Sequence, residues 1–156
     1  MKNISLFSVL FLSTVGFTLH VSAFAAEHSV PCSNLPQAVQ DKIKEVSAGA
    51  VIHGCVKDIS KGVTTWEAEM MAGTRSKDVT FGSNGDVLEV EEQVDVDSLP
   101  IPVKEALLKA AKGGTVDKAE SLSRRGTIVS YEAVIKRKGV HHEIAFHPDG
   151  SAMKAD

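Results

Sequence analysis

Two segments of this chain, 64 residues apart, carry the same pattern. "LPQAVQDKIKEVSAG" at 35–49 and "LPIPVKEALLKAAKG" at 99–113 share their leucine, first proline, valine and final glycine. In each segment apolar residues recur at spacings of four and three, which is typical of one face of an α-helix. Ser33-Asn34 and Asp97-Ser98 are N-cap residue types, and the prolines that follow suit a first helical turn. The pattern predicts two equivalent helices.

The correspondence continues beyond the helices, with an offset of 65 after one inserted residue. "WEA" at 66–68 matches "YEA" at 131–133, Phe81 matches Phe146, and Gly85 matches Gly150. A single insertion, with apolar positions matched throughout, indicates a tandem duplication. We therefore expect each half of the chain to form the same structural unit.

Alternating segments separated by glycines follow each predicted helix, and Asn-Gly and Asp-Gly pairs are typical of hairpin turns. Connections this short require antiparallel neighbours. The predicted fold class is therefore α+β, a tandem duplication in which each copy is one helix followed by a four-stranded antiparallel meander. The expected strands are 51–57, 63–71, 76–82 and 86–92 in the first copy, and 116–122, 127–137, 140–147 and 151–155 in the second.

The first 25 residues have the features of a secretory signal peptide. Lys2 precedes an apolar run that ends in Ala23-Phe24-Ala25, which fits the A-x-A rule and predicts cleavage after Ala25, with cleavage after Ala23 as the alternative. The run is short and interrupted by polar residues, unlike a membrane-spanning helix. We predict a periplasmic or secreted protein with no membrane attachment after cleavage. The expected organisation is a signal peptide at 1–25, an N-terminal segment at 26–34, repeat 1 at 35–92, an acidic link at 93–98 and repeat 2 at 99–156.

Export determines how the two cysteines are interpreted. Cys32 and Cys55 are the only cysteines, and an oxidising compartment favours a disulfide between them. The chain has no CxxC pair for redox exchange, and a tetrahedral zinc site would need two further ligands. We predict a structural disulfide that ties the segment before the first helix to the strand after it.

Strand alternation separates inward from outward residues in the matched "WEA" and "YEA" motifs. Trp66 and Tyr131 are expected to face the helix as large core residues, whereas the glutamates that follow them face outward. The outward acidic residues and the two arginines beside Gly126 are either ordinary solvated charges or contacts for a partner protein. The candidate protein-binding residues are Glu67, Glu69, Glu132, Arg124 and Arg125.

Charge and motif content argue against several classes of function. The formal net charge is −3, and becomes −4 when Lys2 is removed with the signal peptide, so no broad attraction for nucleic acid is expected. There is no GxSxG motif, and the cysteines are expected to be oxidised. Acid–base catalysis would need carboxylates that converge in a cleft, whereas the outward row Glu67, Glu69, Glu89, Glu91 and Glu132 is expected on an open sheet. We predict a protein that is not an enzyme and has no cofactor.

The histidines suggest the main alternative to a protein-binding function. Five histidines follow residue 25, but none forms an HxH or HxxxH pair. Adjacent His141 and His142 would point to opposite faces of a strand, which leaves His141 and His147 as candidate metal ligands on one face. The alternative function is therefore a periplasmic metal- or small-ligand-binding or sensing protein that uses surface histidines and carboxylates.

The exported chain, the duplicated "LP..V...I" helix, the "WEAE" and "YEAV" strands and the "F..NG" and "F.PDG" hairpins resemble the PepSY-like family. This exported family is related in fold to the β-lactamase-inhibitor proteins and to the PepSY modules of peptidase propeptides. The resemblance covers 35–156 and implies a non-enzymatic binding module. Its expected partner is another protein of the cell envelope, such as a peptidase or other enzyme, that the module binds or modulates. The resemblance carries over no individual inhibitory residue.

Overall fold

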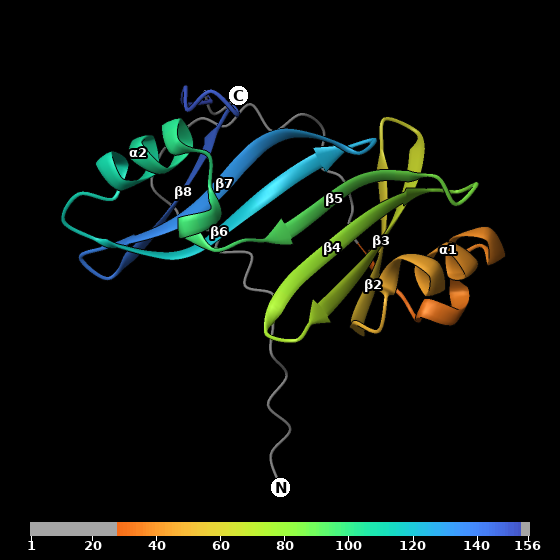
Figure 1. The fold of residues 1–156 in the computed structure, drawn as a ribbon. Helices are drawn as coiled ribbons and strands as arrows, with labels where there is room; N and C mark the ends of the chain where they lie inside the picture. The colour runs from red at the N-terminus through yellow and green to blue at the C-terminus, as the bar shows by residue number, and fades with distance from the viewer. Residues whose placement is uncertain (1–27, 154–156) are drawn as a thin grey trace, which may run out of the picture.

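One antiparallel sheet, with its strands in the order β1 to β8, extends through the chain (Figure 1). The computed structural model describes residues 28–153, so the predicted signal peptide lies outside the described residues. The strands are β1 His28–Ser29, β2 Val51–Ser60, β3 Val63–Ala72, β4 Arg75–Gly82, β5 Val87–Gln93, β6 Thr115–Arg124, β7 Thr127–Arg137 and β8 Val140–Phe146.

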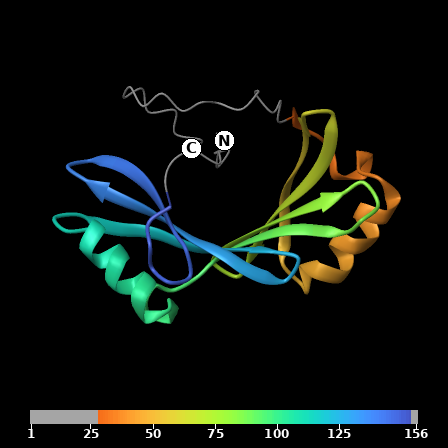
Figure 2. The ribbon, with the colours of Figure 1, turned by 90° about the horizontal axis from the view of Figure 1, so that it is seen from above.

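Two helices, α1 (Gln37–Ser47) and α2 (Ile101–Ala110), lie on the same side of the sheet (Figure 2). Each is preceded by a short 3-10 helix, η1 (Cys32–Asn34) or η2 (Val96–Ser98). No helix within the described residues has the length and apolar character of a membrane span.

The predicted fold class is wrong, because the two halves do not form separate helix-plus-four-strand units. β5 pairs with β4 along one edge and with β6 along the other, so all eight strands belong to one sheet. The described part of the expected strand 151–155 forms a single bridge, from Ala152 to Phe146. Unpaired strand edges expose N–H and C=O groups, and two meanders that share β5 avoid exposing two such edges.

The unpredicted strand β1 shows how β5 serves both halves. Ser29 of β1 lies opposite Val56 of β2, and 64 residues later Gln93 of β5 lies opposite Glu120 of β6. β5 therefore ends the first meander and also begins the second half, in the place that β1 occupies at the start of the first. The tandem duplication itself stays a prediction from the sequence.

Each helix buries its apolar stripe against its own half of the sheet, and the residues that fill the two cores occupy matching positions. Val39 and Val103, at the centres of the two helices, are completely buried, and Phe81 and Phe146 are buried beneath them. The α1 core consists of Leu35, Val39, Ile43, Cys55, Ala68, Met70, Val79 and Phe81. The α2 core consists of Leu99, Val103, Leu107, Ala111, Ala119, Tyr131, Ala133, Ile135 and Phe146.

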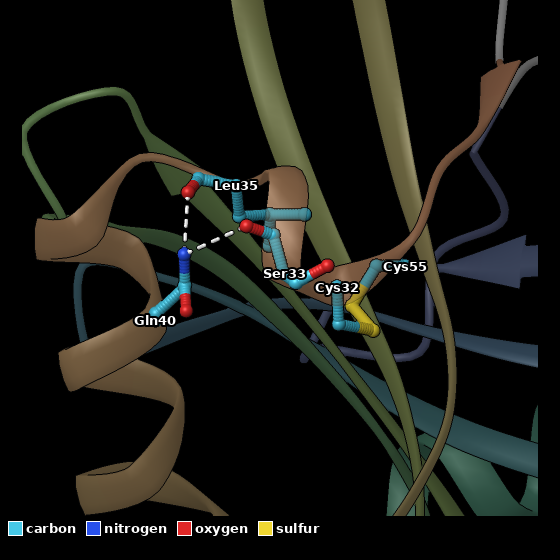
Figure 3. The surroundings of a disulfide bond; sticks show 5 residues. All are labelled: Cys32, Ser33, Leu35, Gln40 and Cys55. Atoms are coloured by element: carbon cyan, nitrogen blue, oxygen red, sulfur yellow. Dashed lines mark hydrogen bonds between the residues drawn. A yellow bond between two sulfur atoms is a disulfide. The ribbon is translucent and has the colours of Figure 1, made fainter.

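The helix starts differ from the predicted caps. Pro36 and Pro100 occupy the N-cap positions, and neither helix has a side-chain cap hydrogen bond, because the expected cap residues belong to η1 and η2. Gln40 supports the start of α1 instead. Its Nε2 donates to the backbone oxygens of Ser33 at 3.2 Å and Leu35 at 2.8 Å (Figure 3).

Candidate functional site: the helix-free face of the sheet

The sheet face opposite the helices has no covering layer within residues 28–153. Figure 2 shows the sheet bent, with both helices on the outside of the bend. Because side chains alternate across a strand, Ala68 and Met70 of β3 face α1 while Glu67 and Glu69 lie on the opposite face. We call this surface the helix-free face.

Carboxylates stand directly opposite one another across the helix-free face. Glu69 of β3 lies opposite Asp78 of β4, and Asp78 lies opposite Glu91 of β5. On the neighbouring strands, Glu120 of β6 lies opposite Glu132 of β7. Like charges in directly opposed positions destabilise a sheet. Stability therefore does not account for this arrangement, and a role in binding would.

The position of Glu91 perturbs its ionisation most strongly. Burial, followed by the nearby charges of Glu132, Glu120, Glu89 and Asp78, raises the pKa of Glu91 to about 7. Burial is also the largest cause that raises the pKa of Glu132 and of Asp78. These carboxylates are thus partly removed from water and lie close enough to repel one another.

Buried neighbours on β6 and β7 explain part of this burial. Leu122 of β6 lies directly across from Glu91, and Ser130 of β7 lies across from Leu122. Both residues are buried, yet neither belongs to the cores beneath the helices. The centre of the helix-free face is therefore a small region of low hydration between the two halves of the molecule.

Two basic side chains offset part of the negative charge. Arg124 Nε donates to Glu89 Oε2 at 2.6 Å, and Lys118 Nζ contacts Glu120 Oε1 at 2.6 Å. Ser76 Oγ donates to the same Glu120 oxygen at 3.2 Å. No ion pair of Glu69, Asp78 or Glu91 occurs within the part of the chain that the structure describes.

The structure brings the predicted protein-binding residues onto this face or its rim. Glu67 and Glu69 lie on β3 and Glu132 on β7, while Arg124 ends β6 and Arg125 lies in the turn to β7. Their role in binding stays a prediction. Sequence reasoning missed Asp78 and Glu120. Both are outward residues of alternating segments, so alternation was the available signal, but only strand register places them beside the others.

The candidate metal ligands do not meet. His141 Nε2 lies 3.0 Å from Asp117 Oδ2, whereas His147 follows β8 and donates its backbone N–H to Ser151 O at 2.9 Å. Within residues 28–153, no group of three or more His, Cys, Asp or Glu side chains is arranged to hold a metal ion.

The predicted disulfide is present. Cys32 of η1 is bonded to Cys55 of β2, with 5.3 Å between their Cα atoms (Figure 3). Cys55 belongs to the α1 core, and the bond attaches the segment before α1 to the sheet. Trp66 packs against the same core, with its Nε1 donating to Ser83 Oγ at 3.2 Å and Lys57 Nζ lying 5.4 Å from its ring centroid.

Solved structures share this arrangement. A BLIP-like protein from Bacteroides fragilis superposes with a TM-score of 0.56 at 23% identity, covering 81% of this chain and 86% of that protein. The chain has a BLIP-like fold. A DUF2874 family protein from Bacteroides ovatus has the same BLIP-like fold, with a TM-score of 0.58 at 18% identity over 77% of this chain and 85% of that one. A predicted periplasmic protein from Bacteroides eggerthii superposes with a TM-score of 0.62 at 16% identity, covering 77% of this chain and 86% of that protein.

These identities show that the BLIP-like fold is shared and say nothing about activity. Neither a protein-family model nor a curated protein sequence matches the chain. The resemblance to the PepSY-like family therefore stays a prediction.

The burial of Glu91, together with the crowding of carboxylates around it, predicts that stability depends on pH. The pKa of Glu91 rises from an ordinary 4.5 to about 7 in the folded protein, so folding retains a proton that the unfolded chain releases between these values. The contribution of this carboxyl to stability is full below its unfolded pKa and is lost as the pH rises through 7. Glu91→Gln is expected to stabilise the protein by about 1 kcal/mol at pH 8, after discounting for solvent screening, and to change little at pH 4.

Urea denaturation at several pH values measures this effect. Glu105→Gln, which removes an exposed glutamate from α2, serves as the control and should keep the pH dependence of the wild type. Equal pH profiles for wild type and Glu91→Gln would show that the pKa of Glu91 is not raised in the folded protein.

Proposed function

We propose that this protein is an exported, non-enzymatic module that uses the helix-free face to bind another protein of the cell envelope and modulate it. The observation that carries the proposal is the row of directly opposed, half-buried carboxylates on that face. Lysine or arginine side chains of a partner would offset the repulsion between Glu69, Asp78 and Glu91. A basic patch on the partner is therefore the complementary surface.

Export is supported by three observations. Residues 1–25 have the sequence pattern of a signal peptide, with predicted cleavage after Ala25, and such a peptide would direct the chain out of the cytoplasm. The disulfide between Cys32 and Cys55 is of the kind that persists in oxidising compartments. Proteins of the same fold include a predicted periplasmic one. We propose a periplasmic or secreted location, and membership of the PepSY-like group of binding modules.

The test combines partner capture with a matched change of charge. The mature protein is immobilised, incubated with periplasmic extract, and its bound proteins are identified by mass spectrometry. Each captured protein is then purified and its affinity measured for wild type and for a face variant, Glu69→Gln/Glu91→Gln/Glu132→Gln. We expect the face variant to bind its partner roughly tenfold more weakly, because rim and core charges of an interface steer and hold complementary partners.

A helix-side variant controls for net charge. Asp41→Asn/Glu45→Gln/Glu105→Gln removes the same number of carboxyl groups from exposed positions of α1 and α2. It should leave the affinity unchanged. A partner that responds equally to both variants binds by general charge attraction, and one that responds only to the helix-side variant binds the other side. Either result would overturn the proposed site.

A further inference from the structure

A shallow pocket of about 410 Å³ lies at one end of the helix-free face, where β4, β5 and β6 meet the turn between β6 and β7. It is lined by Thr80, Leu88, Glu89, Arg124 and Arg125. The lining combines an apolar side chain, a hydroxyl, one carboxylate and two guanidinium groups. It differs from the rest of the helix-free face, where carboxylates dominate.

The ion pair in the pocket leaves most guanidinium donors available. Arg124 contacts Glu89 only through Nε, so both of its terminal Nη groups remain without a hydrogen bond inside the described part of the chain. The Arg125 side chain likewise forms no ion pair among residues 28–153. Two guanidinium groups and one carboxylate give the pocket a net charge of +1 inside an otherwise acidic surface.

The backbone holds Arg125 in place. Its φ of 50° lies in the left-handed region, where glycine and asparagine are the usual residues of such hairpin turns. Its N–H donates to Leu88 O at 3.3 Å, which fixes the turn against β5.

We infer that this pocket binds a carboxylate of the partner protein, from an aspartate, a glutamate or a chain terminus, with Arg125 and the free edge of Arg124 as donors. Guanidinium groups pair with carboxylates through two parallel hydrogen bonds. A net charge of +1 matches a singly charged anion, whereas Glu89 and the surrounding carboxylates repel a dianion such as phosphate. Leu88 offers apolar contact to the carbons that bear the carboxylate. The inference rests on the proposed function and fixes the partner's orientation: its basic patch over the carboxylate row, its acidic group in the pocket.

The pocket can be tested without the partner. The mature, disulfide-bonded protein is labelled with ¹⁵N and titrated with N-acetyl-leucine, which carries a carboxylate, and in parallel with N-acetyl-leucinamide, which does not. We expect saturable shifts of the Arg124 and Arg125 Nε–Hε signals and of the Leu88 amide with the first probe only, with a Kd on the order of 1 mM. Arg125→Gln should weaken binding at least fivefold.

Lys61→Gln is the matched control, because Lys61 occupies the corresponding turn between β2 and β3 with a φ of 51°. It should leave the titration unchanged. Equal shifts with both probes, an Arg125→Gln variant that still binds, or a tighter response to inorganic phosphate would overturn the inference. None of these results would contradict the proposed function, because the proposed function is tested separately by the partner's affinity for the face variant. Conversely, a partner that binds the face variant as tightly as the wild type would contradict the proposed function without changing the result of the probe titration.

Discussion

Replacing Cys32 by valine and Cys55 by alanine is expected to lower the free energy of unfolding by about 3 kcal/mol, the loop-entropy value for a loop of this length. The two replacement residues are those that occupy the matching positions of the second half of the chain. Positions 64 residues further on hold Val96, which packs against the α2 core, and Ala119, which is buried in it. The variant therefore keeps apolar side chains that the same local structure already accommodates.

The second half shows that this structure forms without a covalent bond. Val30 N donates to Cys55 O at 2.9 Å, and Val94 N donates to Ala119 O at 2.9 Å in the matching place. The two halves differ in the strand that precedes the 3-10 helix. The strand before η2 is β5, which is paired along both edges. The strand before η1 is β1, which has only two residues. The disulfide thus supplies an attachment that the longer strand supplies in the second half.

Urea denaturation with and without reductant measures the effect of the disulfide. Reduced wild type should have the stability of the Cys32→Val/Cys55→Ala variant, and reductant should leave the variant unchanged. A loss below about 1 kcal/mol would mean that β1 and η1 are held by packing alone, and that the loop-closure account in which the bond acts on the unfolded chain is wrong here.

The local elements follow from the sequence because their signals are local. The stripe Val39, Ile43 and Val46 predicts α1, and Gly62, Gly73 and Gly85 mark hairpin turns that the structure contains. The joining of the two halves does not follow from local signals. It depends on both edges of β5 being paired, and "VLEVEEQ" carries no mark that distinguishes a shared central strand from the last strand of a meander.

The candidate site is likewise predicted only in part by local sequence signals. Alternation places Glu67, Glu69 and Glu132 on the outward face, where the structure has them. Their neighbours are set by register, and bulges interrupt the pairing in β2, near Phe81 and in β6. A one-residue difference in register would separate Glu69 from Asp78. The directly opposed carboxylates, and with them the raised pKa of Glu91, could therefore be found only in the folded structure.

Gly85→Ala and Gly150→Ala are each expected to destabilise the protein by about 3 kcal/mol, as the sum of left-handed backbone strain and overpacking against a helix. Both glycines have positive φ, 86° and 84°. A Cβ at Gly85 would lie 2.7 Å from the carbonyl oxygen of Ala38 in α1, and one at Gly150 would lie 2.5 Å from that of Pro102 in α2. Because the contacted atoms are backbone, a side-chain rotation cannot relieve either clash. Each clash is relieved only if the turn and the helix move apart.

Gly126→Ala separates the two causes. Gly126 has a φ of 77°, but a Cβ added to it would meet nothing within 4 Å, so only the strain of about 1 kcal/mol remains. Denaturant midpoints with unchanged m-values measure all three variants on one scale. Equal losses for the three alanine variants would show that the hairpins after β4 and β8 can move away from the helices. Larger losses at Gly85 and Gly150 would establish these turns as the points that fix each helix on its half of the shared sheet.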